Sequence, residues 1–195
     1  MWTGGIPEGF ELDHLKNFLE IWKPTGRFGT AIDGGAHRGV WARELAKHFG
    51  RVIALEANPA HAKHLMEQCA ETRNVQCFNI ALGKQHDYVG TSYHGVQGNT
   101  GACHVEGPGL TPMMRLDDTS WPIDFLKLDI EGMELFALEG AAEKIGTYRP
   151  AIMVELNGNG KRFYGVSDDA TKKWLEDRDY ELAMKANKDH FYVPR

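Results

Sequence analysis

The chain has 195 residues, of which 42% are hydrophobic, and its formal net charge is −5. This composition fits one folded domain spanning residues 1–195 and argues against a large nucleic-acid surface, which needs clustered Lys and Arg. The three cysteines show no C-x-x-C spacing, so neither a disulfide framework nor a zinc cluster is indicated. No apolar run approaches membrane-spanning length, and we expect a cytoplasmic protein that binds neither nucleic acid nor membrane.

Helices and strands are predicted to alternate along the chain. A leading amphipathic helix is expected at 10–22, within an N-terminal segment of residues 1–27. Strands are predicted at 28–32, 51–55, 75–80, 123–128 and 151–156, with helices at 40–49, 59–71 and 131–145. A helix capped by Ser167 and a hairpin of strands 180–185 and 190–193 follow. This order predicts an α/β fold with a mostly parallel sheet.

One stretch interrupts the alternation. Residues 84–118 are rich in Gly, His and Asn and have no helical period. We interpret them as an inserted segment that contains a hairpin and lies over a pocket.

Acids and glycines mark the ends of the first two predicted strands. Asp33 and Glu56 end these strands, and Gly34, Gly35 and Gly39 allow a tight turn after the first. Ligands bind outside the carboxyl ends of parallel strands, so both acids are expected in one crevice. Glu56 suits two ribose hydroxyls, whereas Asp33 suits a cationic group better than a pyrophosphate. The pattern predicts a nucleoside-cofactor pocket, and S-adenosylmethionine (SAM) carries a sulfonium and an ammonium.

A nicotinamide cofactor is the nearest competitor. It is typical of G-x-G-x-x-G, whereas the chain has G-G-A-H-R-G. The sequence therefore favours SAM.

Several short motifs occur in an order that is specific. They are I-D-G-G-A-H-R-G (32–39), L-E-A-N-P (55–59), N-I-A-L-G (79–83), G-N-T-G-A (98–102), R-L-D-D-T (115–119), F-L-K-L-D-I-E-G-M-E (125–134), E-G-A (139–141) and A-I-M-V-E-L-N (151–157). In this order the chain resembles the FkbM family of SAM-dependent O-methyltransferases, with His37 where the family commonly has Asn. The resemblance implies a class I methyltransferase fold: a Rossmann-like, mostly parallel seven-stranded sheet with an antiparallel final strand and helices on both faces.

The resemblance also implies the cofactor contacts. The expected cofactor-binding residues are Asp33, Gly35, Ala36, His37, Gly39, Glu56, Ala57, Asn58, Asn79, Ala81 and Asp129.

Transfer of a methyl group to a hydroxyl requires removal of the hydroxyl proton. Asp129, Glu131 and Glu155 are the best candidates for this step, because they lie at or just beyond the ends of adjacent predicted strands. One acid can act as the base, or Asp129, Glu155 and Asn157 can hold a divalent metal, which the spacing does not favour. Glu131 has an equally plausible structural role at a helix N-terminus.

Other polar residues are weighed against simpler roles. His94 and His104, in the inserted segment, are candidates for acceptor contact or for plain exposure. His61 and His64 lie one turn apart and are expected on a solvated helix face. Lys127, in a buried strand, is expected to reach the sheet edge or pair with an acid.

The preferred function is methylation of a hydroxyl on a sugar, a glycan or another small metabolite. The alternatives are a catalytically silent SAM-binding module in an assembly and a nicotinamide-dependent oxidoreductase. The oligomeric state stays open.

Overall fold

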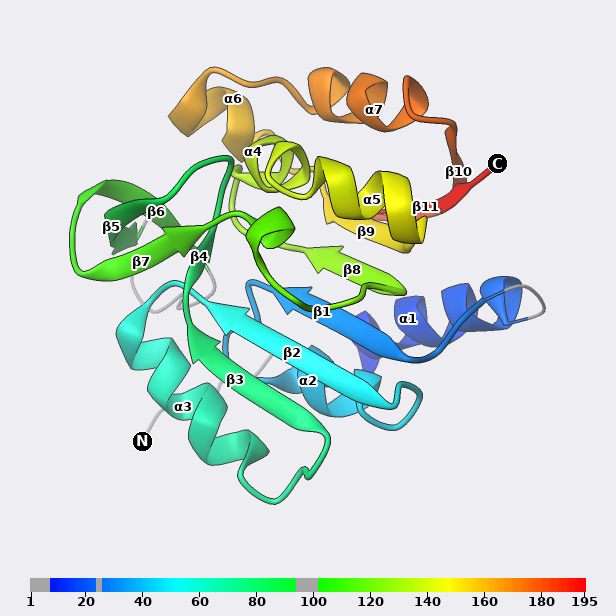
Figure 1. Ribbon diagram of the computed structural model, residues 1–195, viewed down its shortest axis with the longest axis horizontal. Coiled ribbons are helices and arrows are strands. Elements are labelled where there is room, and N and C mark those ends of the chain that lie inside the picture. The colour runs from blue at the N-terminus through cyan, green and yellow to red at the C-terminus, as the bar shows by residue number, and fades with distance from the viewer. Residues whose placement is uncertain (1–7, 24–25, 94–101) are drawn as a thin grey trace.

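The computed structural model describes residues 8–23, 26–93 and 102–195. A seven-stranded sheet in the order β10-β11-β9-β8-β1-β2-β3 forms its centre (Figure 1). All its pairings are parallel except those of β11, which runs antiparallel to both neighbours. The strands are β1 (Thr30–Gly34), β2 (Arg51–Glu56), β3 (Val75–Asn79), β8 (Phe125–Leu128), β9 (Ala151–Glu155), β10 (Tyr180–Ala186) and β11 (Asp189–Pro194).

Helices cover both faces of this sheet (Figure 1). Neighbouring strand residues point to opposite faces, so Ala31 packs with one core cluster and Ile32 with the other. The first face is covered by α1 (Glu8–Trp22), α2 (Val40–Leu45) and α3 (Pro59–Cys69). The second is covered by α4 (Glu134–Glu139), α5 (Ala142–Tyr148) and α7 (Asp168–Glu176). The predicted mostly parallel seven-stranded sheet, with an antiparallel final strand and helices on both faces, is confirmed.

The described parts of the inserted segment contain more than the predicted hairpin. They contribute β5 (Asp87–Tyr93), β6 (Cys103–Pro108) and β7 (Thr111–Met114) to a second sheet, which β4 (Ala81–Leu82), just before the segment, completes in the order β4-β7-β5-β6. A 3-10 helix, η1 (Leu116–Asp118), leads back to the main sheet. This second sheet lies beyond the carboxyl ends of β1, β2 and β8 (Figure 1).

Two further predictions about helices need correction. The helix predicted at 131–145 starts later and is divided in two. Residues 131 and 132 have positive φ angles of 53° and 107°, so α4 begins at Glu134, and the helix is interrupted at Gly140 and Ala141 before α5. A short helix, α6 (Asn159–Tyr164), was not predicted, because its sequence N-G-K-R-F-Y lacks an apolar period. No helix in the described ranges is long and apolar enough to span a membrane.

Candidate functional site

The loop after β1 bends where a side chain has no room. Gly35 has a φ angle of 75°, and a Cβ atom there would lie 1.7 Å from the carbonyl oxygen of Asp129. The amides of Gly35 and Ala36 both donate to the carbonyl of Leu55, at 2.9 and 3.0 Å. Gly39, with a φ angle of 79°, then begins α2. The turn therefore brings the ends of β1, β2 and β8 together, as glycine allows.

Glu56 lies at the carboxyl end of β2 and accepts one backbone hydrogen bond on each oxygen. His37 N donates to Oε2 and Asn58 N donates to Oε1, each at 2.8 Å. Burial raises the pKa of Glu56, and the two backbone donors oppose that rise. Each carboxylate oxygen can accept a second hydrogen bond. This residue can therefore receive a diol such as a ribose while the loop stays fixed.

Two asparagines hold the backbone around Glu56. The Asn58 side chain caps α3 by accepting from the amides of Ala60 and His61, at 2.9 and 3.2 Å. Asn79 donates to the carbonyl oxygens of Glu56 and Ala57, at 2.9 and 3.0 Å. The structure thus uses both side chains to fix the loop. Ala81 is buried in β4, opposite Met113.

Asp33 is buried and already forms an ion pair within the chain. Its side chain is completely buried, and its Oδ1 lies 3.0 Å from the ammonium of Lys127 on β8. Burial raises the pKa of Asp33, and Lys127 opposes the rise. The cationic partner of Asp33 in this structure is therefore a lysine of the chain itself, which agrees with the prediction that Lys127 pairs with an acid.

Three carboxylates converge at the ends of β8 and β9. Asp129, Glu131 and Glu155 each present an oxygen within 4.8 Å of the others. Asn157 Nδ2 donates to Glu155 Oε2 at 2.6 Å and to Glu131 Oε2 at 3.3 Å, and Asn159 also donates to Glu131. We call these three acids the acid cluster. Sequence reasoning placed these acids together correctly, and Asn157 lies among them.

Burial and neighbouring charges raise pKa values within the acid cluster. Burial, then the charges of Asp129 and Glu131, raise the pKa of Glu155 to about 9. Burial, then Asp129, also raises the pKa of Glu131. Glu155 is consequently protonated at neutral pH, while Asp129, with 37% of its side chain exposed, faces solvent. Like charges this close cannot all ionise together.

Glu131 lies in the turn before α4, and its carboxylate accepts from Asn157 and Asn159. At the start of α4, Glu134 Oε1 accepts from the amides of Ile130 and Gly132, both at 3.1 Å. Burial raises the pKa of Glu134 to about 7. An acid at the first position of a helix was a sequence signal for this residue.

The prediction that His61 lies on a solvated helix face was wrong. His61 is only 4% exposed, whereas His64 is exposed as expected. One ring nitrogen, Nε2, lies 3.1 Å from Tyr93 Oη, and the other, Nδ1, lies 3.9 Å from Glu56 Oε1. Burial lowers the pKa of His61 to about 4, so the ring is neutral at pH 7. The small second sheet buries this face of α3, which helical spacing cannot reveal.

The second sheet is attached to the main fold on two sides. Asn58 Nδ2 donates to Thr91 Oγ1 at 3.1 Å, and Tyr164 Oη donates to the Val105 carbonyl at 2.7 Å. His104 is 8% exposed, and its ring stacks on Phe163 at 4.0 Å. Plain exposure of His104 was therefore wrong. His94 lies outside the described residues.

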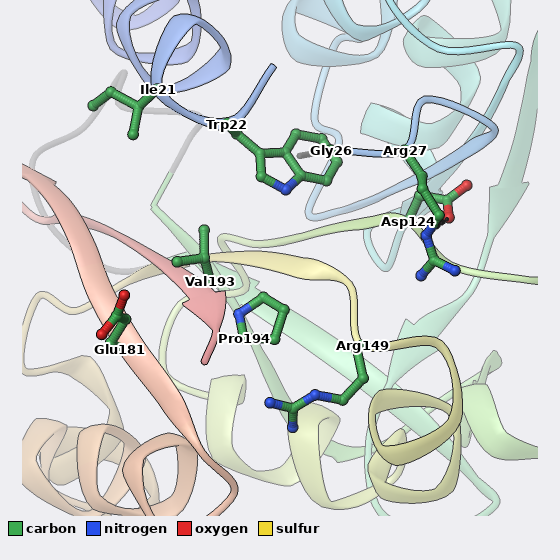
Figure 2. A pocket seen from close by; sticks show the side chains of 9 residues that line it. All are labelled: Ile21, Trp22, Gly26, Arg27, Asp124, Arg149, Glu181, Val193 and Pro194. Atoms are coloured by element: carbon green, nitrogen blue, oxygen red, sulfur yellow. Dashed lines mark ion pairs between the residues drawn. The ribbon is translucent and has the colours of Figure 1, made fainter. Parts of the chain in front are cut away.

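A cavity of about 350 Å³ lies at the opposite, amino-terminal edge of the sheet, among Trp22, Arg27 and Arg149 (Figure 2). Its charges already have partners in the fold. Arg27 Nε lies 3.2 Å from Asp124 Oδ1, and Arg149 donates to the carbonyls of Arg178 and Asp179 at 2.6 and 2.8 Å. Because ligands of such sheets bind at the carboxyl ends of strands, we place the functional site at the acid cluster and Glu56 instead.

The chain is similar to known methyltransferases. Residues 33–182 match the sequence profile of the methyltransferase FkbM domain. A solved FkbM methyltransferase from Methylobacillus flagellatus superimposes with a TM-score of 0.62 and 19% identity, covering 85% of this chain and 43% of that one. The N-methyltransferase NodS from Bradyrhizobium japonicum has a TM-score of 0.57 at 10% identity, with 95% and 97% covered.

A third structure carries the cofactor. Magnesium protoporphyrin IX methyltransferase from Synechocystis, solved with bound SAM, has a TM-score of 0.54 at 13% identity, with 100% of this chain and 87% of that one covered. No curated protein sequence matches the chain. The sheet order, the glycine turn and the carboxyl-end site define a class I methyltransferase fold. Within that class, the match over residues 33–182 shows that the chain belongs to the FkbM methyltransferase family.

Proposed function

We propose that the chain is a SAM-dependent O-methyltransferase whose acceptor is a hydroxyl of a sugar, a glycan or another small metabolite. The observation that carries this proposal is the acid cluster, which supplies a solvent-facing carboxylate at the carboxyl ends of β8 and β9. A hydroxyl acceptor needs such a group to take its proton, whereas an acceptor that is already nucleophilic does not.

The residues around the glycine turn fit the cofactor. Glu56 keeps acceptor capacity on both oxygens, and Gly35 lets the backbone approach without a side chain. SAM supplies an electrophilic methyl group on a sulfonium, and its leaving thioether needs no proton. Glu56 would hold the ribose, and the loop from Asp33 to Gly39 would hold the methionine end.

Asp129 would accept the proton of the acceptor hydroxyl. It is accessible, with 37% of its side chain exposed, while Glu155 keeps its own proton at neutral pH. Lys127 Nζ lies 3.6 Å from Asp129 Oδ2 and stabilises its negative charge. Alignment of acceptor and methyl group supplies much of the remaining catalysis.

A metal ion is the competing way to activate the hydroxyl. Asp129, Glu155 and Asn157 offer the oxygen ligands that hard divalent cations prefer. The hydrogen bond from Asn157 Nδ2 to Glu155 Oε2 supports the base instead, because it occupies an oxygen that a metal would need.

The first experiment is calorimetry with SAM, with its product S-adenosylhomocysteine (SAH) and with NADH. We expect heat from SAM and SAH only, and NADH binding without SAM binding would contradict the proposal. The second is methyl transfer from isotope-labelled SAM to a panel of sugars, amino sugars and small alcohols, followed by mass spectrometry. Label on an amine, or SAM binding without any transfer, would favour an N-methyltransferase or a silent binding module.

A further inference from the structure

Lys127 is a buried ammonium directly beneath the glycine turn. It is 1% exposed, and its Nζ lies 3.0 Å from Asp33 Oδ1 and 3.6 Å from Asp129 Oδ2. It also donates to the carbonyl oxygens of Gly34 and Gly35, at 3.5 and 3.3 Å. Lys127 thus connects β8 to the loop that would receive the charged end of the cofactor.

The three groups form a compact set of charges. Burial disfavours a charge on Lys127, but Asp33 and Asp129 outweigh burial and raise its pKa, so it stays protonated. With both carboxylates ionised, one positive and two negative charges give this set a net charge of about −1. Asp33 and Lys127 are both inaccessible to water, so their charges are poorly screened.

We propose that Lys127, by cancelling the charge of Asp33, sets how strongly the site prefers cationic SAM over neutral SAH, an inference that rests on the proposed function. The two ligands differ by the methyl group and its positive charge. A change in the charge of the set acts on the sulfonium alone, whereas a loss of shape weakens both ligands. The ratio of the SAH and SAM dissociation constants therefore reports the charge rather than the structural integrity of the loop.

The test measures this ratio by calorimetry at low salt in the full chain. Asp33→Asn removes one negative charge and keeps Lys127, so the net charge becomes neutral and the preference for SAM should fall by roughly threefold to tenfold. Adding Lys127→Met to Asp33→Asn restores the net charge, so the double variant should regain the wild-type ratio. A merely structural role for the pair predicts equal losses for SAM and SAH in every variant.

Lys144 offers the matched control. It is also a buried lysine, 8% exposed, but it donates to the Trp121 carbonyl at 2.9 Å on the other face of the sheet. Lys144→Met should leave the ratio unchanged. A folded Asp33→Asn with the wild-type ratio would overturn the inference, as would a double variant that keeps the altered ratio.

A third variant decides the matter if Asp33→Asn does not fold. Lys127→Met removes only positive charge, so its preference for SAM should rise, and an equal or lower preference would overturn the inference. Wild-type protein that binds neither ligand would overturn the proposed function itself. If the wild type binds both ligands but no charge variant changes the ratio of the SAH and SAM dissociation constants, this inference alone is overturned.

Discussion

Single carboxylates in this protein have different tasks because their surroundings differ. Glu56 and Glu134 are both buried and both accept backbone amides, but Glu56 lies at the open end of β2 whereas Glu134 supports a turn. Asp33 is neutralised by Lys127 and has no water contact. Of these, Glu56 is the residue whose loss should affect a ligand most directly.

Glu56→Gln should weaken SAM and SAH binding by on the order of 1–3 kcal/mol, because the ribose hydroxyls lose a charged acceptor. The change keeps the shape, but its amide nitrogen replaces one of the two oxygens that accept backbone amides, so part of the loss falls on the loop. Calorimetry measures the effect, and Glu67→Gln, on the exposed face of α3, is the control. Unchanged affinity would show that the ribose lies elsewhere.

Asp129→Asn should lower turnover by about a hundredfold while SAM affinity changes little, because it removes the acid that would take the acceptor proton. Glu155→Gln should lower turnover much less, because Gln resembles the protonated carboxyl that Glu155 carries at neutral pH. The measurement is the initial rate with the acceptor identified from the panel. A chelator distinguishes the metal alternative, since loss of activity that Mg²⁺ or Mn²⁺ restores would contradict proton removal by Asp129 alone. A wild-type rate in Asp129→Asn would assign that acid a structural role.

His61 should make the fold less stable in acid. Its pKa is about 4 in the folded chain and about 6.5 in the unfolded chain, so the unfolded state binds more protons between these values. Stability is therefore retained above pH 6.5 and lost as the pH falls toward 4, by on the order of 2–3 kcal/mol.

The contribution of His61 is measured by urea unfolding of the wild type and His61→Gln at pH 7.5 and pH 4.5. It is the difference between the two proteins in the stability lost over this pH interval. The substituted chain should lose less stability over that interval. His64→Gln, one turn along α3 and exposed, is the matched control. Equal acid losses in wild type and His61→Gln would show that the ring is accessible to protons in the fold.

At the scale of elements, strand positions were the most predictable part. The strand cores expected near residues 51–55 and 151–156 form as β2 and β9, because continuous apolar runs with flanking acids have few other uses in an α/β chain. The convergence of Asp129, Glu131 and Glu155 followed from the same strand ends. Their catalytic roles remain predictions.

The elements that sequence reasoning missed depend on distant contacts. The inserted segment became a sheet because Asp87, Tyr88 and Val89 of β5 pair with β7, which local periodicity cannot show. Likewise α6 begins where Gly132 must approach closely, since a Cβ there would lie 2.7 Å from Gly160 N. Both features require knowledge of which distant backbone lies nearby.

Tyr164→Phe should loosen the second sheet while the main sheet stays intact. The variant loses the hydrogen bond to the Val105 carbonyl, which contributes about 1 kcal/mol. Hydrogen exchange should quicken at the amides of β5 and β6 and stay unchanged in β1 and β2.

In the wild type, SAH together with an acceptor should slow exchange in β5 and β6, since these strands lie beyond the carboxyl ends of the main sheet. Equal exchange in free and ligated protein would make the segment a fixed structural sheet.

At the scale of the whole molecule, the candidate site and the strand that completes the core lie in different parts of the sheet. The carboxyl ends of β1, β2, β8 and β9 carry the acids, whereas β11 fills the sheet between β9 and β10. The chain spans 43% of the FkbM methyltransferase structure from Methylobacillus flagellatus, so acceptor recognition by the whole protein is part of the proposal.

The family match ends at residue 182, within β10, yet the fold should require the residues beyond it. Phe191 and Tyr192 of β11 are 0% and 2% exposed, and they enter opposite core clusters. A chain ending at residue 182 would leave β9 without its antiparallel neighbour and both clusters incomplete. Phe191→Ala alone should cost about 3–5 kcal/mol, a large share of the stability of a domain this size. Circular dichroism and urea unfolding should show the truncated chain unfolded and Phe191→Ala destabilised, while Leu182→Ala, at a position 49% exposed, serves as the control. Cooperative unfolding of the truncated chain at the wild-type urea midpoint would show that β11 is dispensable.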